Sequence, residues 1–339
     1  MATLATGQLT LADWSKRISP DGKIDPIAEL LSQQNDVLED VVFVEANQPT
    51  SHVVTIRTGL PAVYWRAYNQ GVPSSKSTTA QATEPCAMLE SRSHIDAKLL
   101  QLNNNSAEFR LSEESAFIEA MNQEMTGKIF NGNVGADLKT FSGLATRYSS
   151  TTAGNGQNVI LAGGTGSDNA SVYLVVWGKQ TVFCPFPKGS QAGLKSRDLG
   201  EESVQDAGGN WYQAARSLFQ WDAGLVVKDW RYVVRIANID ISDWVGVTGT
   251  QASTASSNLI KLMMRAIARI PNFSMGRAAF YTNRSIQEGL MIQALEKSNN
   301  ALAIQEALSQ FGTKMNQLTF MGIPVRQVDQ LGIAETLVS

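Results

Sequence analysis

Residues 221–240 read WDAGLVVKDWRYVVRIANID, and apolar side chains alternate through the second half of this stretch. Alternation with a period of two predicts a β-strand whose two faces meet different surroundings. The face predicted to pack into a core consists of Trp230, Tyr232, Val234 and Ile236. The opposite face consists of Asp229, Arg231, Val233 and Arg235. The two arginines of this second face have room for partners, so we take them as candidate contact residues.

The composition around this stretch is rich in apolar residues and poor in charge. Hydrophobic residues make up 43% of the 339 residues, which is enough for a substantial core. Charged residues make up only 17%, against roughly 25% in an average soluble domain. A surface with few charges repels its neighbours weakly, which fits a protein that covers much of its surface with copies of itself. The length predicts about two domains, or one elaborate domain.

The charge and the cysteine content argue against several classes of protein. The net charge is −3 and no basic patch stands out, so a dedicated nucleic-acid binder is not expected. Cys86 and Cys184 are the only cysteines, too few for the disulfide framework of a secreted fold. The N-terminus has neither the charged start nor the apolar core of a signal peptide. The clearest apolar run, 172–177, is far shorter than the ~20 residues of a membrane span.

The first third of the chain predicts an arm and a ribbon. Residues 1–48 read as an arm with short helices, and residues 49–102 as one long β excursion. The excursion includes a polar tip at 71–79 that has no apolar face. Two-stranded ribbons are marginally stable alone, so we expect this one to lie on another surface.

One helix is predicted more clearly than any other, over 112–131. Ser112 can cap its N-terminus, acidic residues follow in the first turn, and Gly132 can end it. An apolar stripe recurs at every fourth position, which predicts a packed face. This stripe, which we interpret as core packing, consists of Phe117, Met121, Met125 and Ile129.

The remaining chain alternates strands with two further helices. Residues 150–169 predict a loop, followed by a hairpin of 171–177 with 181–186. A β-rich meander then leads to Ile241. We expect a helix from about Ser257 to Pro271, a strand over 277–281, a helix over 284–297 and one final strand over 318–329.

Residues with catalytic potential are scarce. Only two histidines occur, His52 and His94, and both lie in the predicted ribbon, where we interpret them as ordinary polar strand residues. The cluster Gly163–Ser167 lacks the lysine that ends a phosphate-binding loop and precedes a strand. No zinc-binding spacing occurs. We therefore expect no enzyme, no cofactor and no metal site.

Several fragments between about residues 170 and 335 carry a family resemblance through their joint order. They are VWG at 176–178, FPKGS at 186–190, DWRY at 229–232, RIANID at 235–240, MGRAAFYTNR at 275–284 and GIPVRQVD at 322–329. In this order they resemble the major capsid proteins of tailed bacteriophages with the Hong Kong 97 fold. The likeness is strongest to the capsid proteins of epsilon-15-type short-tailed phages.

The resemblance implies an α+β fold with a fixed set of parts. These are an N-terminal arm (1–48), an extended E-loop ribbon (49–102), a P-domain with a long spine helix (103–149), mainly an A-domain (150–310) and a returning C-terminal strand (311–339). Residues that would touch neighbouring subunits are, by this reading, Val72, Pro73, Lys76 and Thr78 at the tip, together with Arg231 and Arg235.

The resemblance also implies a function and partners. The chain would assemble through pentamers and hexamers into an icosahedral shell, the virion capsid, around weakly contacted double-stranded DNA. Assembly would take place in the host bacterial cytoplasm, with portal, scaffolding and cement or decoration proteins as partners, and without a membrane. Two alternatives stay open: a non-viral shell of the same fold that encloses cargo enzymes, and an enzyme of unfamiliar α+β fold.

Covalent crosslinking between subunits is not expected. In some relatives of this fold, an E-loop lysine forms an isopeptide bond with an asparagine of a neighbouring subunit. Lys76 is the credible donor here, because Lys98 would lie at the base of the ribbon. The serines and threonines around Lys76 offer its amine no apolar enclosure.

Overall fold

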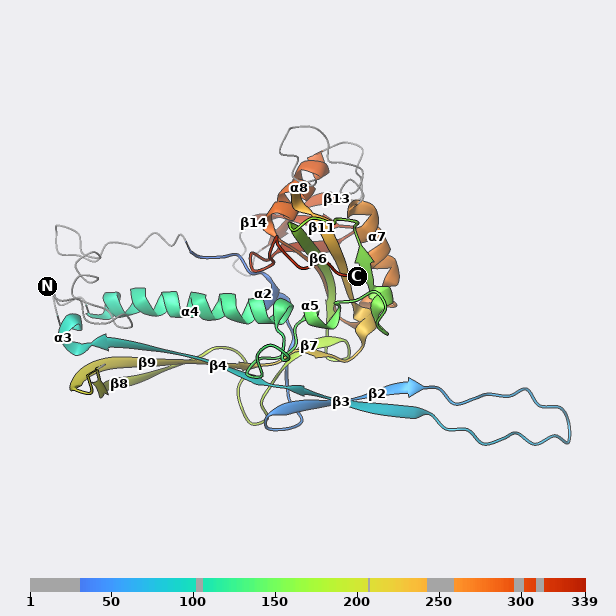
Figure 1. Ribbon diagram of the computed structural model, residues 1–339, viewed down its shortest axis with the longest axis horizontal. Coiled ribbons are helices and arrows are strands. Elements are labelled where there is room, and N and C mark those ends of the chain that lie inside the picture. The colour runs from blue at the N-terminus through green and yellow to red at the C-terminus, as the bar shows by residue number, and fades with distance from the viewer. Residues whose placement is uncertain (1–30, 102–105, 207, 243–258, 296–301, 309–313) are drawn as a thin grey trace.

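The computed structural model describes residues 31–101, 106–206, 208–242, 259–295, 302–308 and 314–339. A ten-stranded sheet forms the centre of the body, and a long helix, a narrow three-stranded sheet and a two-stranded ribbon extend from it (Figure 1). The main path of the large sheet runs β1-β7-β6-β12-β15-β14-β13, with β10 beside β7 and β11 between β6 and β5. Its strands are β1 (Phe43–Glu45), β5 (Val159–Leu161), β6 (Asn169–Trp177), β7 (Val182–Phe186), β10 (Val226–Val227), β11 (Val233–Asp240), β12 (Arg277–Thr282), β13 (Leu302–Leu308), β14 (Lys314–Phe320) and β15 (Ile323–Gln327).

Strand β6 lies at the centre of this sheet, and every one of its residues is buried. Because side chains alternate across a strand, β6 serves two hydrophobic clusters. Tyr173, Val175 and Trp177 belong to the cluster that includes the end of the long helix. Residues 172, 174 and 176 belong to the cluster on the other face, where α7 (Leu259–Arg269) and α8 (Arg284–Leu295) pack. The sheet is thus covered on both faces.

The shorter helical segments connect or cover these layers. They are α2 (Val37–Asp40), α3 (Ala97–Leu100), α5 (Leu144–Arg147) and the 3₁₀ turns η2 (Gly156–Asn158), η3 (Trp230–Tyr232) and η5 (Phe273–Met275). Buried polar groups connect helix α2 to the central sheet through hydrogen bonds. Trp177 Nε1 donates to the Tyr281 hydroxyl at 2.7 Å, and that hydroxyl donates to Asp40 Oδ2 at 2.9 Å.

The long helix α4 (Ser106–Asn131) starts six residues before the expected Ser112. Its additional N-terminal part has an apolar anchor of its own, because Phe109 is buried with Ile95, Leu100 and Ala215. A cap at Ser112 was therefore a wrong prediction. The C-terminal end is as expected: a side chain at Gly132 would place its Cβ 2.3 Å from the Phe141 carbonyl oxygen, so the chain turns tightly there.

The narrow sheet lies along α4 and consists of β4 (Ala87–Asp96), β9 (Trp211–Ala223) and β8 (Lys195–Gln205), in the order β4-β9-β8 (Figure 1). Strand β4 pairs with β9 over ten residue pairs, from Ala87↔Ala223 to Asp96↔Ala214. The expectation of a single ribbon over 49–102 thus differs from the structure. Only β2 (Ser51–Gly59) and β3 (Thr78–Pro85) form the ribbon, because β4 has a longer partner elsewhere.

The stretch at 221–240 differs from its prediction in where the strand starts and in how much of it is buried. Trp230–Tyr232 forms the 3₁₀ turn η3, where the Asp229 side chain accepts a hydrogen bond from the Arg231 backbone N–H, and the strand starts only at Val233. All but the last residue of β11 are buried. Alternation predicted one exposed face, but β11 pairs with strands on both sides and lies under a packed layer on each face.

The predicted hairpin and the predicted single final strand are also wrong. Strand β7 pairs with β1 and β10 and meets β6 only at Trp177↔Val182, so 171–186 is not a hairpin. The final strand is divided into β14 and β15 by a tight turn, in which Met321 and Gly322 have φ values of 50° and 82°. Positive φ at both central residues is what a two-residue hairpin turn requires. Strands β5 and β13 were not predicted.

The two later helices and the strand between them agree with expectation within a few residues. Strand β12 covers the predicted 277–281, and α7 and α8 cover most of the predicted helices. The expected helix start at Ser257, the end of the second helix at 296–297 and most of the arm, 1–30, lie outside the described residues.

Candidate assembly surfaces

The far part of the ribbon exposes large apolar side chains. Every residue from Leu60 to Ser75 is exposed, including Leu60, Val63, Trp65 and Tyr68. Within this loop only isolated hydrogen bonds occur, such as that from the Ser75 hydroxyl to the Ala62 carbonyl at 2.7 Å. We name Leu60, Val63, Tyr64, Trp65 and Tyr68 the aromatic strip. Exposed aromatic residues of this size are typical of surfaces that bind another protein.

The predicted contact residues of the tip lie in the same region. Val72, Pro73, Lys76 and Thr78 are all exposed. Thr78 starts β3, and its hydroxyl hydrogen-bonds that of Thr58 across the ribbon at 3.1 Å. We predicted the contact at these four residues of the tip and missed the aromatic strip beside them. The signal was present as three aromatic residues within 64–68, in a segment that we read only as continuing strand.

The stripe on the long helix packs inside the subunit. Met121, Met125 and Ile129 are buried in the cluster that contains one face of the central sheet. Phe117 is partly buried against the same cluster and stacks on Phe219, with 6.1 Å between ring centroids. These residues therefore position α4 and are not part of an exposed surface.

The two arginines of the opening stretch have different surroundings. Arg231 is exposed over 54% of its side chain and pairs with Asp229 at 2.7 Å. Arg235 is only 4% exposed. Its guanidinium donates to the Tyr148 carbonyl at 2.9 Å, to the Ser171 hydroxyl at 3.0 Å and to Glu335 Oε2 at 2.8 Å. Arg235 is thus enclosed within its own chain, and we withdraw it as a contact residue.

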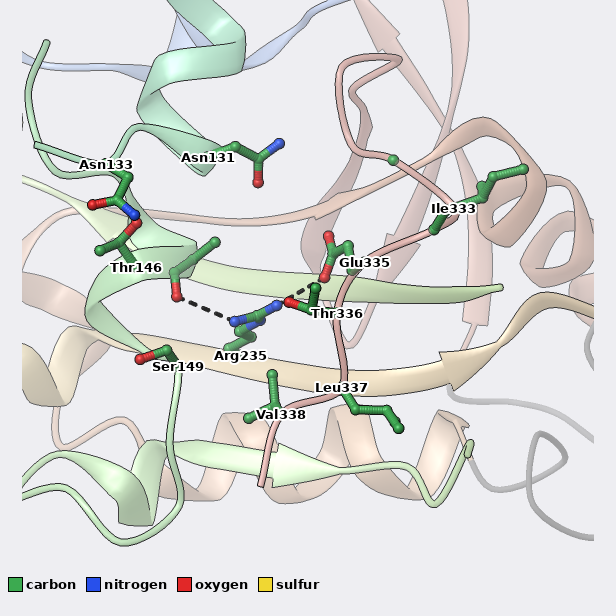
Figure 2. A pocket seen from close by; sticks show the side chains of 13 residues that line it. Asn131, Asn133, Thr146, Ser149, Arg235, Ile333, Glu335, Thr336, Leu337 and Val338 are labelled. Carbon is green, nitrogen blue, oxygen red and sulfur yellow. Dashed lines mark hydrogen bonds and ion pairs between the residues drawn. The ribbon is translucent and has the colours of Figure 1, made fainter. Parts of the chain in front are cut away.

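A cavity of about 580 Å³ lies beside Arg235, between the end of α4, α5 and the C-terminal segment (Figure 2). Its polar lining includes Asn131, Asn133, Thr146 and Ser149. Arg235 and Glu335, the only ionisable residues of the lining, neutralise each other. A cavity lined by an internal ion pair and neutral amides and hydroxyls has no acid and base poised for proton transfer.

The C-terminal segment that forms one wall of this cavity is tied to β11. Asn238 has φ 58° and lies in the irregular part of β11 between Ile236 and Ile239. Its side-chain amide donates to the Val338 carbonyl at 2.8 Å and accepts from the Val338 N–H at 3.0 Å. The sequence contained no signal for this contact, because nothing local relates Asn238 to a residue one hundred positions later.

Burial shifts the pKa values of both histidines and both cysteines. His52 lies edge-on to Phe183 at 5.2 Å, and burial followed by the charge of Lys228 lowers its pKa. Burial likewise lowers the pKa of His94, with Arg216 and Arg92 adding to the effect. Burial raises the pKa of the Cys86 thiol to about 11 and raises that of Cys184, so neither is a thiolate near neutral pH.

No group of three or more His, Cys, Asp or Glu side chains in the described part of the chain could hold a metal ion. No helix in those residues is both long and apolar enough to cross a membrane.

Comparison with known proteins identifies relatives along nearly the whole chain. The family model described as major capsid protein GP7 matches residues 19–339. The structure resembles a chain from the near-atomic structure of bacteriophage epsilon15, with a TM-score of 0.72 and 29% identity over 100% of this chain and 99% of that one. It also resembles the capsid of bacteriophage JBD30, with a TM-score of 0.50 and 9% identity over 93% and 99% of the two chains. No curated protein sequence matches significantly. The fold is the Hong Kong 97 fold of phage capsid proteins.

Proposed function

The chain belongs to the major capsid protein GP7 family, and on that premise we propose that it assembles through pentamers and hexamers into an icosahedral shell around double-stranded DNA. The observation that carries this proposal is the exposed aromatic strip on the ribbon. Apolar surface left in water costs about 25 cal/mol per Å² relative to burial. The ribbon extends from its own body (Figure 1), so it can bury its aromatic strip against a neighbouring copy.

The proposal extends to the parts of the chain. We propose that 1–48 is the N-terminal arm, 49–102 the E-loop region, 103–149 the P-domain with the spine helix, 150–310 mainly the A-domain and 311–339 the returning C-terminal segment. This division is supported by helix α4, which falls within 103–149, and by the central sheet, most of whose strands fall within 150–310. Within the E-loop region, β2 and β3 form the projecting part.

Partners other than copies of the chain are part of the proposal. We propose portal, scaffolding and cement or decoration proteins as partners, assembly in the host bacterial cytoplasm, and no catalytic role. Contact with packaged DNA should be weak, because a net charge of −3 gives little phosphate neutralisation. Particles that contain protein cargo and no genome would instead indicate a non-viral shell.

Substitution of Trp65 tests the proposal. Trp65→Ser and Tyr68→Ser should leave the subunit folded, because both side chains are exposed. Shell yield should collapse, because truncating a tryptophan that is an interface hot spot costs about 2 kcal/mol or more and the contact recurs in every subunit. Yield is measured by sedimentation, and folding by circular dichroism and melting temperature.

The matched control is Ser74→Ala, an exposed residue of the same loop with little surface to lose. This variant should assemble like the wild type. If Trp65→Ser and Tyr68→Ser subunits assemble with wild-type yield, the aromatic strip is not an assembly contact.

A further inference from the structure

The base of the ribbon is held by a set of contacts from three segments of the body. We name Val54, Glu84, Arg147, Phe183 and Gly224 the ribbon socket. Glu84 and Val54 belong to the ribbon strands β3 and β2, whereas Arg147 ends α5, Phe183 lies in β7 and Gly224 lies between β9 and β10. The socket therefore joins the ribbon to both the central sheet and the narrow sheet.

An ion pair with two parallel hydrogen bonds forms the polar side of the socket. Arg147 donates from one terminal nitrogen to Glu84 Oε1 at 2.7 Å and from the other to Oε2 at 2.6 Å. The two side chains are only 19% and 15% exposed. Two-point arginine–carboxylate pairs fix mutual orientation as well as distance. Among the described residues, no other ion pair links β2 or β3 to the body.

The remaining donors of Arg147 hold the guanidinium itself in place. Its Nε donates to the Ser142 carbonyl at 3.0 Å, and a terminal nitrogen donates to the Leu225 carbonyl at 3.2 Å. One planar group thus bonds the segment before α5, the connection between β9 and β10, and the ribbon. Lysine has no planar fork and could not make this set of bonds.

Two further contacts, one apolar and one steric, hold the ribbon base beside the ion pair. Val54 is buried with Phe183 and Val226 in a small cluster of their own. Gly224 lies so close to the end of β3 that a Cβ there would be 2.4 Å from the Pro85 carbonyl oxygen. Val54 and Glu84 project from the same face of the ribbon, because Glu84 pairs with His52, two residues before Val54. This face of the ribbon base is therefore held by both an apolar and an ionic contact, and the direction of the ribbon depends on both.

We infer that Arg147 is a positioning residue that sets the angle at which the ribbon leaves the body, and through it the curvature of the assembled shell. The inference rests on the proposed function. Strand β2 has nine residues, and a strand rises about 3.3 Å per residue. A rotation of about 10° at the base would therefore move the far end of the paired region by roughly 5 Å. The aromatic strip lies beyond that end, so its displacement is larger still.

The test compares three single variants of the full chain. Arg147→Lys keeps the charge and removes the two-point bond. Glu84→Gln is milder, because it keeps an acceptor for Arg147 while removing the ion pair. Arg92→Lys is the matched control, since Arg92 pairs with Glu90 at 3.9 Å, both side chains are largely exposed, and the pair lies on β4 away from the socket. The measurements are the melting temperature of unassembled subunits and the diameters of assembled particles in electron micrographs.

We expect folded Arg147→Lys subunits to give mixed diameters, open sheets or no closed shells, and Glu84→Gln to broaden the diameters less. Arg92→Lys should give the wild-type diameter. If Arg147→Lys does not fold, the particle diameters of Glu84→Gln alone test the inference. Folded socket variants that form shells of the wild-type diameter distribution would overturn the inference and leave the proposed function intact. Wild-type protein that does not assemble would instead overturn the proposed function.

Discussion

Two arginines four positions apart in the chain have opposite energetic roles. Arg235 is buried and paired with Glu335, whose side chain is 13% exposed, whereas Arg231 pairs with Asp229 at the surface. Breaking a buried ion pair leaves an uncompensated charge and costs about 3–5 kcal/mol. An exposed pair contributes at most about 1 kcal/mol. We predict that Arg235→Ala greatly lowers the free energy of unfolding in urea and that Arg231→Ala changes it little.

Comparable losses for both arginine variants would contradict this assignment. The sequence could not separate the two residues, because a period of two reports only that they share a face. Whether that face is exposed depends on the C-terminal segment, which lies about one hundred residues further along the chain. The burial and pairing of a candidate contact residue could therefore not be predicted where they depend on such distant segments.

We predict that two histidines make stability depend on pH. Burial lowers the pKa values of His52 and His94, while unfolded histidine titrates near 6.5. The unfolded state therefore binds more protons between the folded and unfolded pKa values. The free energy of unfolding should be constant above that window and fall as the pH drops through about 6.5. In His52→Gln the fall should be shallower, as measured by urea unfolding of unassembled subunits from pH 8 to pH 5.

The slope distinguishes titration from packing in this experiment. Loss of the contact between His52 and Phe183 lowers stability at every pH, so it shifts the curve without changing its slope. An unchanged slope in His52→Gln would show that His52 does not contribute to the pH dependence.

At the scale of elements, α4 has a buried face and an exposed face, and substitutions on the two faces should differ in their effect on stability. Met121 is 3% exposed, whereas the Glu124 side chain is 53% exposed and pairs with Lys128 at 3.3 Å. Truncating a buried methionine to alanine typically costs about 2–5 kcal/mol, and a surface pair one turn apart contributes about 0.3–0.5 kcal/mol. We predict losses of these sizes for Met121→Ala and Glu124→Ala in urea unfolding. Equal losses would mean that the helical face is assigned wrongly.

Elements defined by helical periodicity were predicted well, and strands, which are defined by their partners, were not. The recurrence of Phe117, Met121, Met125 and Ile129 is local, and their helix exists as expected. Strand β4 could not be separated from the ribbon, because only its register with β9 reveals its partner. The same holds for β7, whose partners β1 and β10 lie far from it in the chain.

The fold of the whole molecule was predicted through the order of short fragments and not through its pairings. Fragments such as 275–284 and 322–329 lie on neighbouring strands, where β12 pairs with β15 in parallel. Their joint order therefore reflects one packed sheet. The aromatic strip was missed because its three aromatic residues within 64–68 were read as continuing strand, and a local pattern does not report that they are exposed.

At this scale the shell should be held together without covalent bonds. Lys76 is exposed on the ribbon tip, among serine and threonine residues that give its amine no apolar enclosure. We predict that assembled particles boiled in detergent release one band near 36.7 kDa. A ladder of oligomers that disappears in Lys76→Ala would show that crosslinks form through this lysine.

Electron microscopy of the purified wild-type chain tests the central claim most directly. The exposed aromatic strip and the family both lead us to expect closed particles with icosahedral symmetry, built from rings of five and six subunits. Three-dimensional reconstruction should place the ribbon of one subunit against a neighbouring copy. A protein that remains monomeric across salt and crowding conditions, with the aromatic strip in water, would contradict the account.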